Sequence, residues 1–221
     1  MANKVKKSES TKASKANTKA KRPLLRFVPW VLLVCGIIGT LAAGTLVFDE
    51  IKLAKNPDAN LLCSIDPILS CGSVMQSSQA TAFGNLPNPV IGLVTFPALV
   101  TIGVCMLAGA VVAKRWFWRA ASTVSFLGVV FCHWLFFQTV YNIGNLCIYC
   151  MVTWAVTFIS WLYITLYAME QGHIKLKAAW WPKFVGFVRR HHVDIIVLWA
   201  IIIIFLILKH FWYYYGPKFG F

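Results

Sequence analysis

Five long apolar segments dominate the hydrophobic pattern of the chain, and shorter stretches that hold most of the charged residues separate them. The apolar segments cover residues 27–48, 90–113, 120–140, 147–169 and 193 to about 213. Each is close to the roughly 20 residues that a helix needs to cross the hydrocarbon of a bilayer. Backbone hydrogen bonds must be satisfied internally there. The pattern therefore predicts an all-α integral membrane protein with five transmembrane helices.

The composition agrees with this pattern. Of the 221 residues, 59% are hydrophobic and 13% are charged, whereas an ordinary soluble domain has about 25% charged residues. The net charge is +14, and nine of the 21 lysines and arginines lie in residues 1–26. That stretch has few large apolar residues, so we expect a disordered tail. A basic tail before a membrane span favours contact with anionic lipid over nucleic-acid binding.

The distribution of basic residues predicts the orientation of the helices. With a cytoplasmic N-terminus, the cytoplasmic segments are residues 1–26, 114–119 and 170–192, and they carry 17 of the 21 lysines and arginines. This bias is the one found in membrane proteins whose cytoplasmic loops are positive. The same topology places residues 49–89 and 141–146 on the outer side.

Four of the seven cysteines then converge on the outer, oxidising side. Cys63 and Cys71 lie in the long outer loop, and Cys147 and Cys150 begin the fourth span. Two thiols three residues apart at a helix start share one face. The free N–H groups and the helix dipole favour a thiolate on Cys147. Cys150 lies one turn deeper, toward a lipid-soluble oxidant.

These cysteines suggest a relay, in which electrons pass from an outer dithiol to Cys63 and Cys71, then to Cys147 and Cys150, then to an acceptor in the membrane. Simpler interpretations remain open at this point. The loop pair is well placed to close an inert structural disulfide, and the helix pair can be mere packing. A four-cysteine zinc site is a further alternative, although it usually has a second Cys-x-x-Cys motif.

Four other residues in the predicted spans carry candidate chemistry. Cys35, Cys105 and Cys132 are expected to be small buried hydrophobic residues. His133 is an ionisable type of residue deep in a span. It either makes a hydrogen bond inside the bundle or has a functional role.

The motifs "CSIDPILSC", Ser77 with a later "FG", "NPVIG" at one helix start and "CIYC" at another follow one another along the chain. This order resembles the vitamin K epoxide reductase family over roughly residues 27–170. The resemblance implies a four-helix catalytic bundle around a quinone, with a peripheral fifth helix in residues 193–221. The outer loop with a short interfacial helix would cap the bundle, and residues 171–192 would form a cytoplasmic loop. Bacterial members look like disulfide-generating oxidases that pass electrons to a quinone.

The resemblance also implies roles for the cysteines. Cys150 would react with the quinone, either menaquinone or ubiquinone, and Cys147 would exchange with Cys71. Cys63 would meet the thiol partner first. Many bacterial relatives carry a thioredoxin-like domain after the fifth span, and this chain ends soon after it. We therefore expect a separate DsbA-type thioredoxin-fold partner, acting in oxidative protein folding at the bacterial cell membrane.

Further residues are implied to lie near the quinone. Ser77 matches a serine close to the active site. Asn88 matches an asparagine that donates a hydrogen bond to a quinone carbonyl, where negative charge develops during reduction. Trp154 stands where vertebrate enzymes have a tyrosine, which favours plain quinone reduction over action on the epoxide. Phe83 is expected on the apolar side of a short helix over residues 74–83 that seals the pocket.

Two other function classes remain as alternatives. One is a vitamin K epoxide reductase in the strict sense. The other is a non-enzymatic scaffold or transporter whose cysteines are structural. The spans contain almost no acidic or basic residues, so an ion or proton path through them is not expected.

Overall fold

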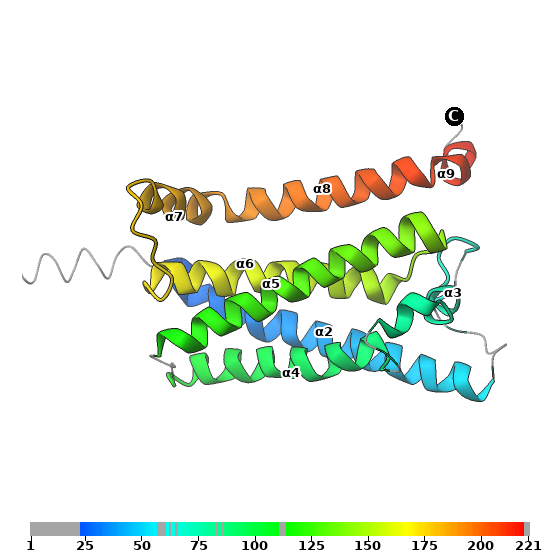
Figure 1. The fold of residues 1–221 in the computed structure, drawn as a ribbon, viewed down its shortest axis with the longest axis horizontal. Coiled ribbons are helices and arrows are strands. Elements are labelled where there is room, and N and C mark those ends of the chain that lie inside the picture. The colour runs from blue at the N-terminus through cyan, green and yellow to red at the C-terminus, as the bar shows by residue number, and fades with distance from the viewer. Residues whose placement is uncertain are drawn as a thin grey trace, which may run out of the picture.

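The computed structural model describes residues 23–56, 61, 63–64, 66–82, 84, 86–110 and 114–218. Residues 1–22, which form most of the predicted basic tail, lie outside this description. Five long helices run through the molecule (Figure 1): α2 (Pro23–Lys55), α4 (Asn88–Leu107), α5 (Arg115–Phe137), α6 (Ile148–Glu170) and α8 (His192–His210). Shorter elements connect them: α3 (Cys71–Met75), the 3₁₀ turn η1 (Ser78–Thr81), the π-helical turn η2 (Gln138–Ile143), α7 (Trp181–Arg190) and α9 (Trp212–Lys218).

All five long helices are long and apolar enough to cross a membrane, and this confirms the predicted fold class. Their bounds differ from the apolar segments at some ends. The first helix continues past residue 48 to Lys55, because its last turns bury Leu53 beside the loop that follows. The second helix ends at Leu107 rather than 113, where Gly109 adopts a left-handed φ of 81° that terminates helices.

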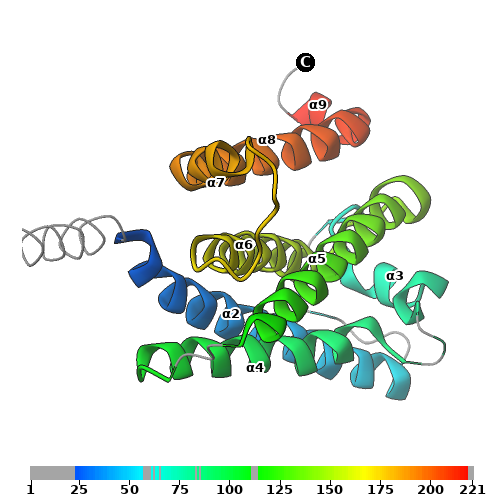
Figure 2. The same ribbon diagram turned by 60° about the vertical axis from the view of Figure 1, so that its left-hand side comes forward.

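Four of the long helices form a bundle. α2 packs against α4 and α6, and α5 packs against α6. Figures 1 and 2 show α8 set apart from these four helices, joined to α6 through α7. None of the side chains of α8 is fully buried, as expected for a helix whose surroundings are lipid. The predicted arrangement, a four-helix bundle with a peripheral fifth helix, is therefore confirmed.

Small residues allow α2 and α4 to approach closely. A Cβ added to Gly103 of α4 would lie 2.9 Å from the backbone nitrogen of Leu33 and 3.0 Å from the carbonyl oxygen of Pro29. A Cβ on Gly36 of α2 would lie 2.8 Å from the backbone nitrogen of Val100. Packing at glycine is a common way for membrane helices to associate. It fixes the crossing of the two helices that carry one wall of the site.

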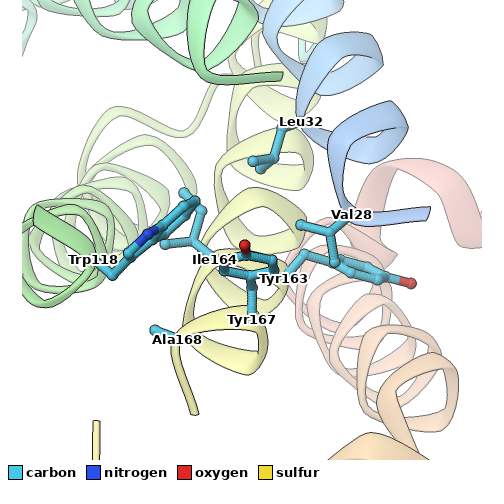
Figure 3. Packing of buried hydrophobic residues seen from close by; sticks show 7 residues of the cluster. All are labelled: Val28, Leu32, Trp118, Tyr163, Ile164, Tyr167 and Ala168. Carbon is cyan, nitrogen blue, oxygen red and sulfur yellow. The ribbon is translucent and has the colours of Figure 1, made fainter. Parts of the chain in front are cut away.

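A cluster of buried hydrophobic residues with three aromatic rings lies at the end of the bundle away from the cysteines. Figure 3 shows Trp118 of α5 pointing toward α6, and Val28 and Leu32 approaching from α2. The rings of Trp118 and Tyr167 have centroids 4.4 Å apart. Through this cluster α2, α5 and α6 pack together at that end of the bundle, and different contacts hold the cysteine end.

A polar contact in the middle of the membrane region joins α8 to the bundle. The indole N–H of Trp199 donates to Nε2 of His133 at 2.8 Å. Because Nε2 accepts, Nδ1 carries the proton and donates to the carbonyl oxygen of Val129 at 2.8 Å. Trp199 also stacks on Phe158, with ring centroids 4.5 Å apart. His133 thus makes the hydrogen bonds of a packing residue, the simpler of its two interpretations.

Candidate active site

The four cysteines predicted to converge lie together at one end of the bundle. Cys63, Cys71 and Cys147 are buried in one apolar cluster, and Cys150 packs against it. The other buried members come from α2, α3 and the loop between them: Leu46, Leu53, Leu61 and Val74. Two pairs that are distant in sequence therefore share one buried, apolar environment.

Cys63 and Cys71 form a disulfide, with Cα atoms 5.7 Å apart. The sequence left open whether they pair, and the structure shows that they do. Both residues are almost inaccessible, with exposed fractions of 3% for Cys63 and 0% for Cys71. Cys147 and Cys150 are free thiols. The structure thus shows an oxidised loop pair packed against a reduced helix pair.

Backbone contacts hold the loop beside the start of α6. Leu69 and Leu146 form a parallel bridge, in which the N–H of Leu146 donates to the carbonyl oxygen of Ile68 at 2.7 Å. The chain reaches this position after η2, which is followed by Gly144 as its C-cap with a left-handed φ of 71°. The residue directly before Cys147 is therefore hydrogen-bonded to the loop that carries Cys71.

The far end of the fifth helix also contacts this loop. Phe211, at the junction of α8 and α9, is fully buried in a cluster with Ile68 and Leu146. The hydroxyl of Tyr214 donates to Oδ1 of Asp66 at 3.5 Å. Two aromatic residues of this segment therefore contact the loop between α2 and α3.

Cys147 has the environment of an activated thiol. It is the N-cap of α6, and its Sγ accepts the backbone N–H of Cys150 at 3.4 Å. The pKa of Cys147 is lowered from its ordinary value, first by a hydrogen bond from the Cys150 thiol and then by backbone N–H groups, against the opposing effect of burial. This is the behaviour predicted for the first cysteine of a Cys-x-x-Cys pair at a helix start.

A cavity of about 760 Å³ lies inside the bundle next to these cysteines. Cys150 lines it, whereas Cys147 is fully buried among the loop cysteines. Thr95 and Ala98 of α4 line the cavity and are exposed, as are Val124 and Leu127 of α5. The cavity therefore opens between these two helices, on a side of the bundle that faces lipid.

Three of the four residues predicted near the quinone line this cavity: Ser77, Asn88 and Trp154. The side-chain amide of Asn88 donates to the carbonyl oxygen of Gln79 at 2.7 Å, and its Oδ1 accepts the N–H of Ala82 at 3.1 Å. Asn88 therefore braces the turn around η1. The structure does not test its predicted hydrogen bond to a quinone, which stays a prediction.

The other predicted residues have simple packing contacts. Ser77 donates its hydroxyl to the carbonyl oxygen of Val74 at 2.6 Å. Trp154 is 4% exposed and packs edge-on against Phe136, with ring centroids 5.5 Å apart. Phe83 lies outside the described residues. Ser77 and Trp154 both line the cavity. Their predicted roles beside a quinone stay predictions.

The short helix predicted over residues 74–83 is divided in two. α3 ends at Met75 and η1 begins at Ser78, because Ser77 between them adopts an extended conformation with ψ of 152°. The predicted apolar side nevertheless faces the cavity, since Val74, Met75 and Ala80 all line it. These residues cover the cavity at the cysteine end of the bundle.

The remaining cysteines differ from one another. Cys35 is buried in the bundle core, as predicted. Cys105 is exposed on the surface of α4, so its predicted burial is wrong. Cys132 of α5 lines the cavity and packs in a cluster with Cys150. Only the crossing of α5 and α6 brings Cys132 there, and no sequence motif marks it.

The chemical character of the cavity fits a quinone. Its walls are mostly apolar side chains, and two thiols, several amides and hydroxyls and the carboxyl group of Glu50 lie among them. Pockets for small organic ligands have this character, with a few polar groups that fix the orientation of the ligand. The residues that would hold a quinone ring are therefore Cys150, Asn88 and Trp154, with the apolar residues of α4 and α5 around them.

A comparison with known proteins places these features in one family. The family model for the vitamin K epoxide reductase family matches residues 30–165. The matched region is more than half of the 221-residue chain. It contains all four clustered cysteines and every residue that lines the cavity.

Proposed function

Because the chain belongs to the vitamin K epoxide reductase family, we propose that it is a quinone-dependent thiol oxidase that generates disulfides. The family carries membrane-bound redox chemistry of disulfides and quinones. One observation supports the more specific proposal. Cys150 lines the apolar cavity, while Cys147, one turn away, is packed against the disulfide of Cys63 and Cys71.

The electrons enter at the loop disulfide in this proposal. A thiolate of an outer dithiol partner attacks Cys63, and Cys71 leaves as a thiolate. The second partner thiol then attacks the mixed disulfide and releases Cys63. The partner has lost two electrons and becomes a disulfide, and the loop pair is reduced. Exchange of this kind depends on the thiolate form of the attacking group and on a good leaving group.

The second exchange passes the electrons to the helix pair. Cys71 attacks Cys147 of a Cys147–Cys150 disulfide, and Cys150 leaves. Cys63 then attacks Cys71, so that the loop disulfide forms again and Cys147 is released as a thiolate. The products are an oxidised loop pair and a reduced helix pair, which is the state that the structure describes.

The final acceptor is a lipid-soluble quinone. When bound in the cavity, it supplies a two-electron, two-proton acceptor, and the helix pair returns to a disulfide. Asn88 has two amide hydrogens, of which one is bonded to Gln79. Its second N–H is the donor that would orient a carbonyl and stabilise negative charge on that oxygen. Cys150 is the thiol on the cavity wall.

The thiol partner that we propose is a separate DsbA-type protein with a thioredoxin fold. Such a dithiol is itself strongly oxidising, with a potential of roughly −120 mV. Its reoxidation needs an acceptor with a more positive potential, which menaquinone or ubiquinone in the membrane can provide. A cysteine pair at the end of a membrane helix can meet both an aqueous thiol and a lipid-soluble acceptor.

We also propose a bacterial cell membrane as the location, with the cysteine end outside. The opposite end of the bundle carries many basic residues: Lys114, Arg115, Arg119, Lys175, Lys177, Lys183, Arg189 and Arg190. A positive cytoplasmic side accounts for this asymmetry. It places Cys63, Cys71 and Cys147 in the oxidising compartment.

The test is anaerobic quinone reduction by the purified protein with a reduced thioredoxin-fold dithiol, using a menaquinone and a ubiquinone separately. We expect one quinol per dithiol for the wild type and for Cys105→Ala, whose thiol lies on the exposed surface of α4. Cys150→Ala should reduce quinone only at the background rate. Full activity of folded Cys150→Ala, or no quinol with the folded wild type, would contradict the proposal. Turnover of vitamin K epoxide in parallel samples would instead favour the strict reductase.

A further inference from the structure

A buried carboxylate lies against the loop disulfide. Asp49, near the end of α2, is 4% exposed, and its Oδ2 is 4.0 Å from Sγ of Cys63. In the described part of the chain, no lysine or arginine forms an ion pair with it. A buried carboxylate without a cationic partner costs free energy. Its position beside Cys63, which reacts in the proposed relay, suggests a role in the reaction of that sulfur.

The contact changes character with the redox state of the loop. In the disulfide, Sγ of Cys63 carries no hydrogen, so it cannot donate to Asp49. After reduction, the same sulfur gains a hydrogen and becomes a donor toward the carboxylate. A negative charge at this distance also disfavours a thiolate on Cys63. Both effects keep the reduced Cys63 protonated.

We propose that Asp49 is a catalytic residue of the thiol relay, which holds reduced Cys63 as a thiol and thereby makes Cys71 the thiolate that attacks Cys147. The inference rests on the proposed function, since it assigns the proton in that relay. Asp49 is the only residue it adds to the relay.

When the partner attacks Cys63, the bond between Cys63 and Cys71 breaks, and its electron pair leaves on Cys71. Cys63, once released from the partner, takes a proton from water and donates it in a hydrogen bond to Asp49. Cys71 attacks Cys147, and Cys150 leaves with the electron pair and takes a proton from water. Cys63 then transfers its proton to Asp49 as it attacks Cys71, and Cys147 departs as a thiolate. Asp49 returns the proton to water and is again a carboxylate.

The surroundings of Cys63 and Cys147 favour the last step, in which Cys63 attacks Cys71 and Cys147 is released. Negative charge moves from Cys63, beside the carboxylate, to Cys147. The hydrogen bond from the Cys150 thiol is the largest influence on the pKa of Cys147, and this bond lowers that pKa. Asp49 raises the pKa of Cys147 only as the smallest of the influences. Asp49 contacts Sγ of Cys63 and has only this small effect on Cys147, so negative charge moves away from the carboxylate in this step.

The experiment measures the protonation of Cys63 directly, in the full-length chain in detergent. In Cys71→Ala/Cys147→Ala/Cys150→Ala, Cys63 is the one remaining thiol of the cluster. Its alkylation by iodoacetamide is followed by mass spectrometry of the Cys63 peptide from pH 6 to 11, which spans the ordinary thiol range of about 8.5. The same series is run with Asp49→Asn, with Asp49→Glu, and with Asp194→Asn as a control. Asp194 lies at the opposite end of the molecule, in the first turn of α8.

We expect Asp49→Asn to move the pH midpoint of alkylation down by about one unit or more. Asp49→Glu and Asp194→Asn should keep the midpoint of the parent. An unchanged midpoint in Asp49→Asn would overturn the proposal, even if the rate changed, because a purely structural residue affects access without affecting protonation.

A second comparison covers the case in which Asp49→Asn does not fold. The midpoint of Cys63 in the folded parent is compared with that of the same chain in denaturant. The proposal requires a higher midpoint in the folded chain, and an equal or lower one would overturn it. These assays use neither quinone nor partner, so a failure of the proposed quinone reduction would be seen separately from a failure of this inference.

Discussion

The backbone N–H of Cys150 donates to Sγ of Cys147 at 3.4 Å, and the two thiols have different surroundings on either side of this contact. Cys147 is buried with the loop disulfide, and Cys150 lines the cavity. In the proposed relay, one turn of helix therefore separates the thiol that would exchange with the loop from the thiol that would meet a lipid-soluble acceptor. The same turn stabilises a thiolate on Cys147.

This relationship predicts the pH dependence of Cys147. Because its pKa is lowered, its thiolate is present at a pH where an ordinary cysteine is still protonated, and it is lost as the pH falls through that lowered pKa. Cys150→Ala removes the hydrogen bond from the second thiol. We expect the alkylation curve of Cys147 to move up by about one pH unit, as measured by mass spectrometry of its peptide.

Cys35→Ala is the control for that series, because Cys35 lies in the bundle core in a different cluster. Its removal should leave the curve of Cys147 in place. A curve that did not move in Cys150→Ala would mean that the backbone N–H groups alone lower the pKa of Cys147.

The crossing of α2 and α4 predicts a difference between two glycine substitutions. A Cβ at position 103 would lie 2.9 Å from the backbone nitrogen of Leu33, so Gly103→Ala must separate the helices. We expect a cost of about 1–3 kcal/mol, typical of overpacking, seen as a lower midpoint of thermal unfolding in detergent.

The matched control is Gly44→Ala on α2. Its Cβ would meet only the Cδ1 of Leu93, at an ordinary 3.9 Å. Alanine also favours a helix more than glycine does, so the midpoint should stay or rise. Equal midpoints for the two variants would contradict the close packing at Gly103.

The contact of Phe211 with the cysteine loop predicts an effect of the fifth helix on the site. Phe211→Ala removes a fully buried ring that packs against Ile68 and Leu146. The hydrogen bond from the N–H of Leu146 to Ile68 should then open more often. We expect hydrogen exchange at Leu146 to become at least about tenfold faster, as measured by mass spectrometry in detergent.

Tyr213→Ala is the neighbouring control, because Tyr213 is 69% exposed. It should leave the exchange of the loop unchanged. If Phe211→Ala also left it unchanged, the backbone bridge would hold the loop without help from α8 and α9.

Local patterns were sufficient to predict the five spans and the position of the four outer cysteines. Apolar length predicts a membrane helix wherever it occurs, because each helix satisfies its own backbone hydrogen bonds. The spacing of Cys147 and Cys150 at a helix start likewise predicts an activated thiol, because the N–H groups that stabilise it belong to the same turn. The convergence of four cysteines followed from counting the spans between them.

Other features required contacts between segments far apart in the chain. Nothing near Asp49 in the sequence marks it as a neighbour of Cys63, and no motif in the fifth span predicts the burial of Phe211 against the loop. The division of the short helix at Ser77 and the exposure of Cys105 were likewise not predicted.

The sequence by itself therefore determined the class of protein, the number of long apolar helices and the convergence of four cysteines at one end of the bundle. Only the tertiary structure decided which thiol faces the cavity, which acid meets a sulfur and which helix end holds the loop. The physical reason is that hydropathy and helix capping depend on neighbours in the chain. The surroundings of a buried side chain depend instead on how whole helices cross, and in this bundle that crossing depends on close contacts at glycine.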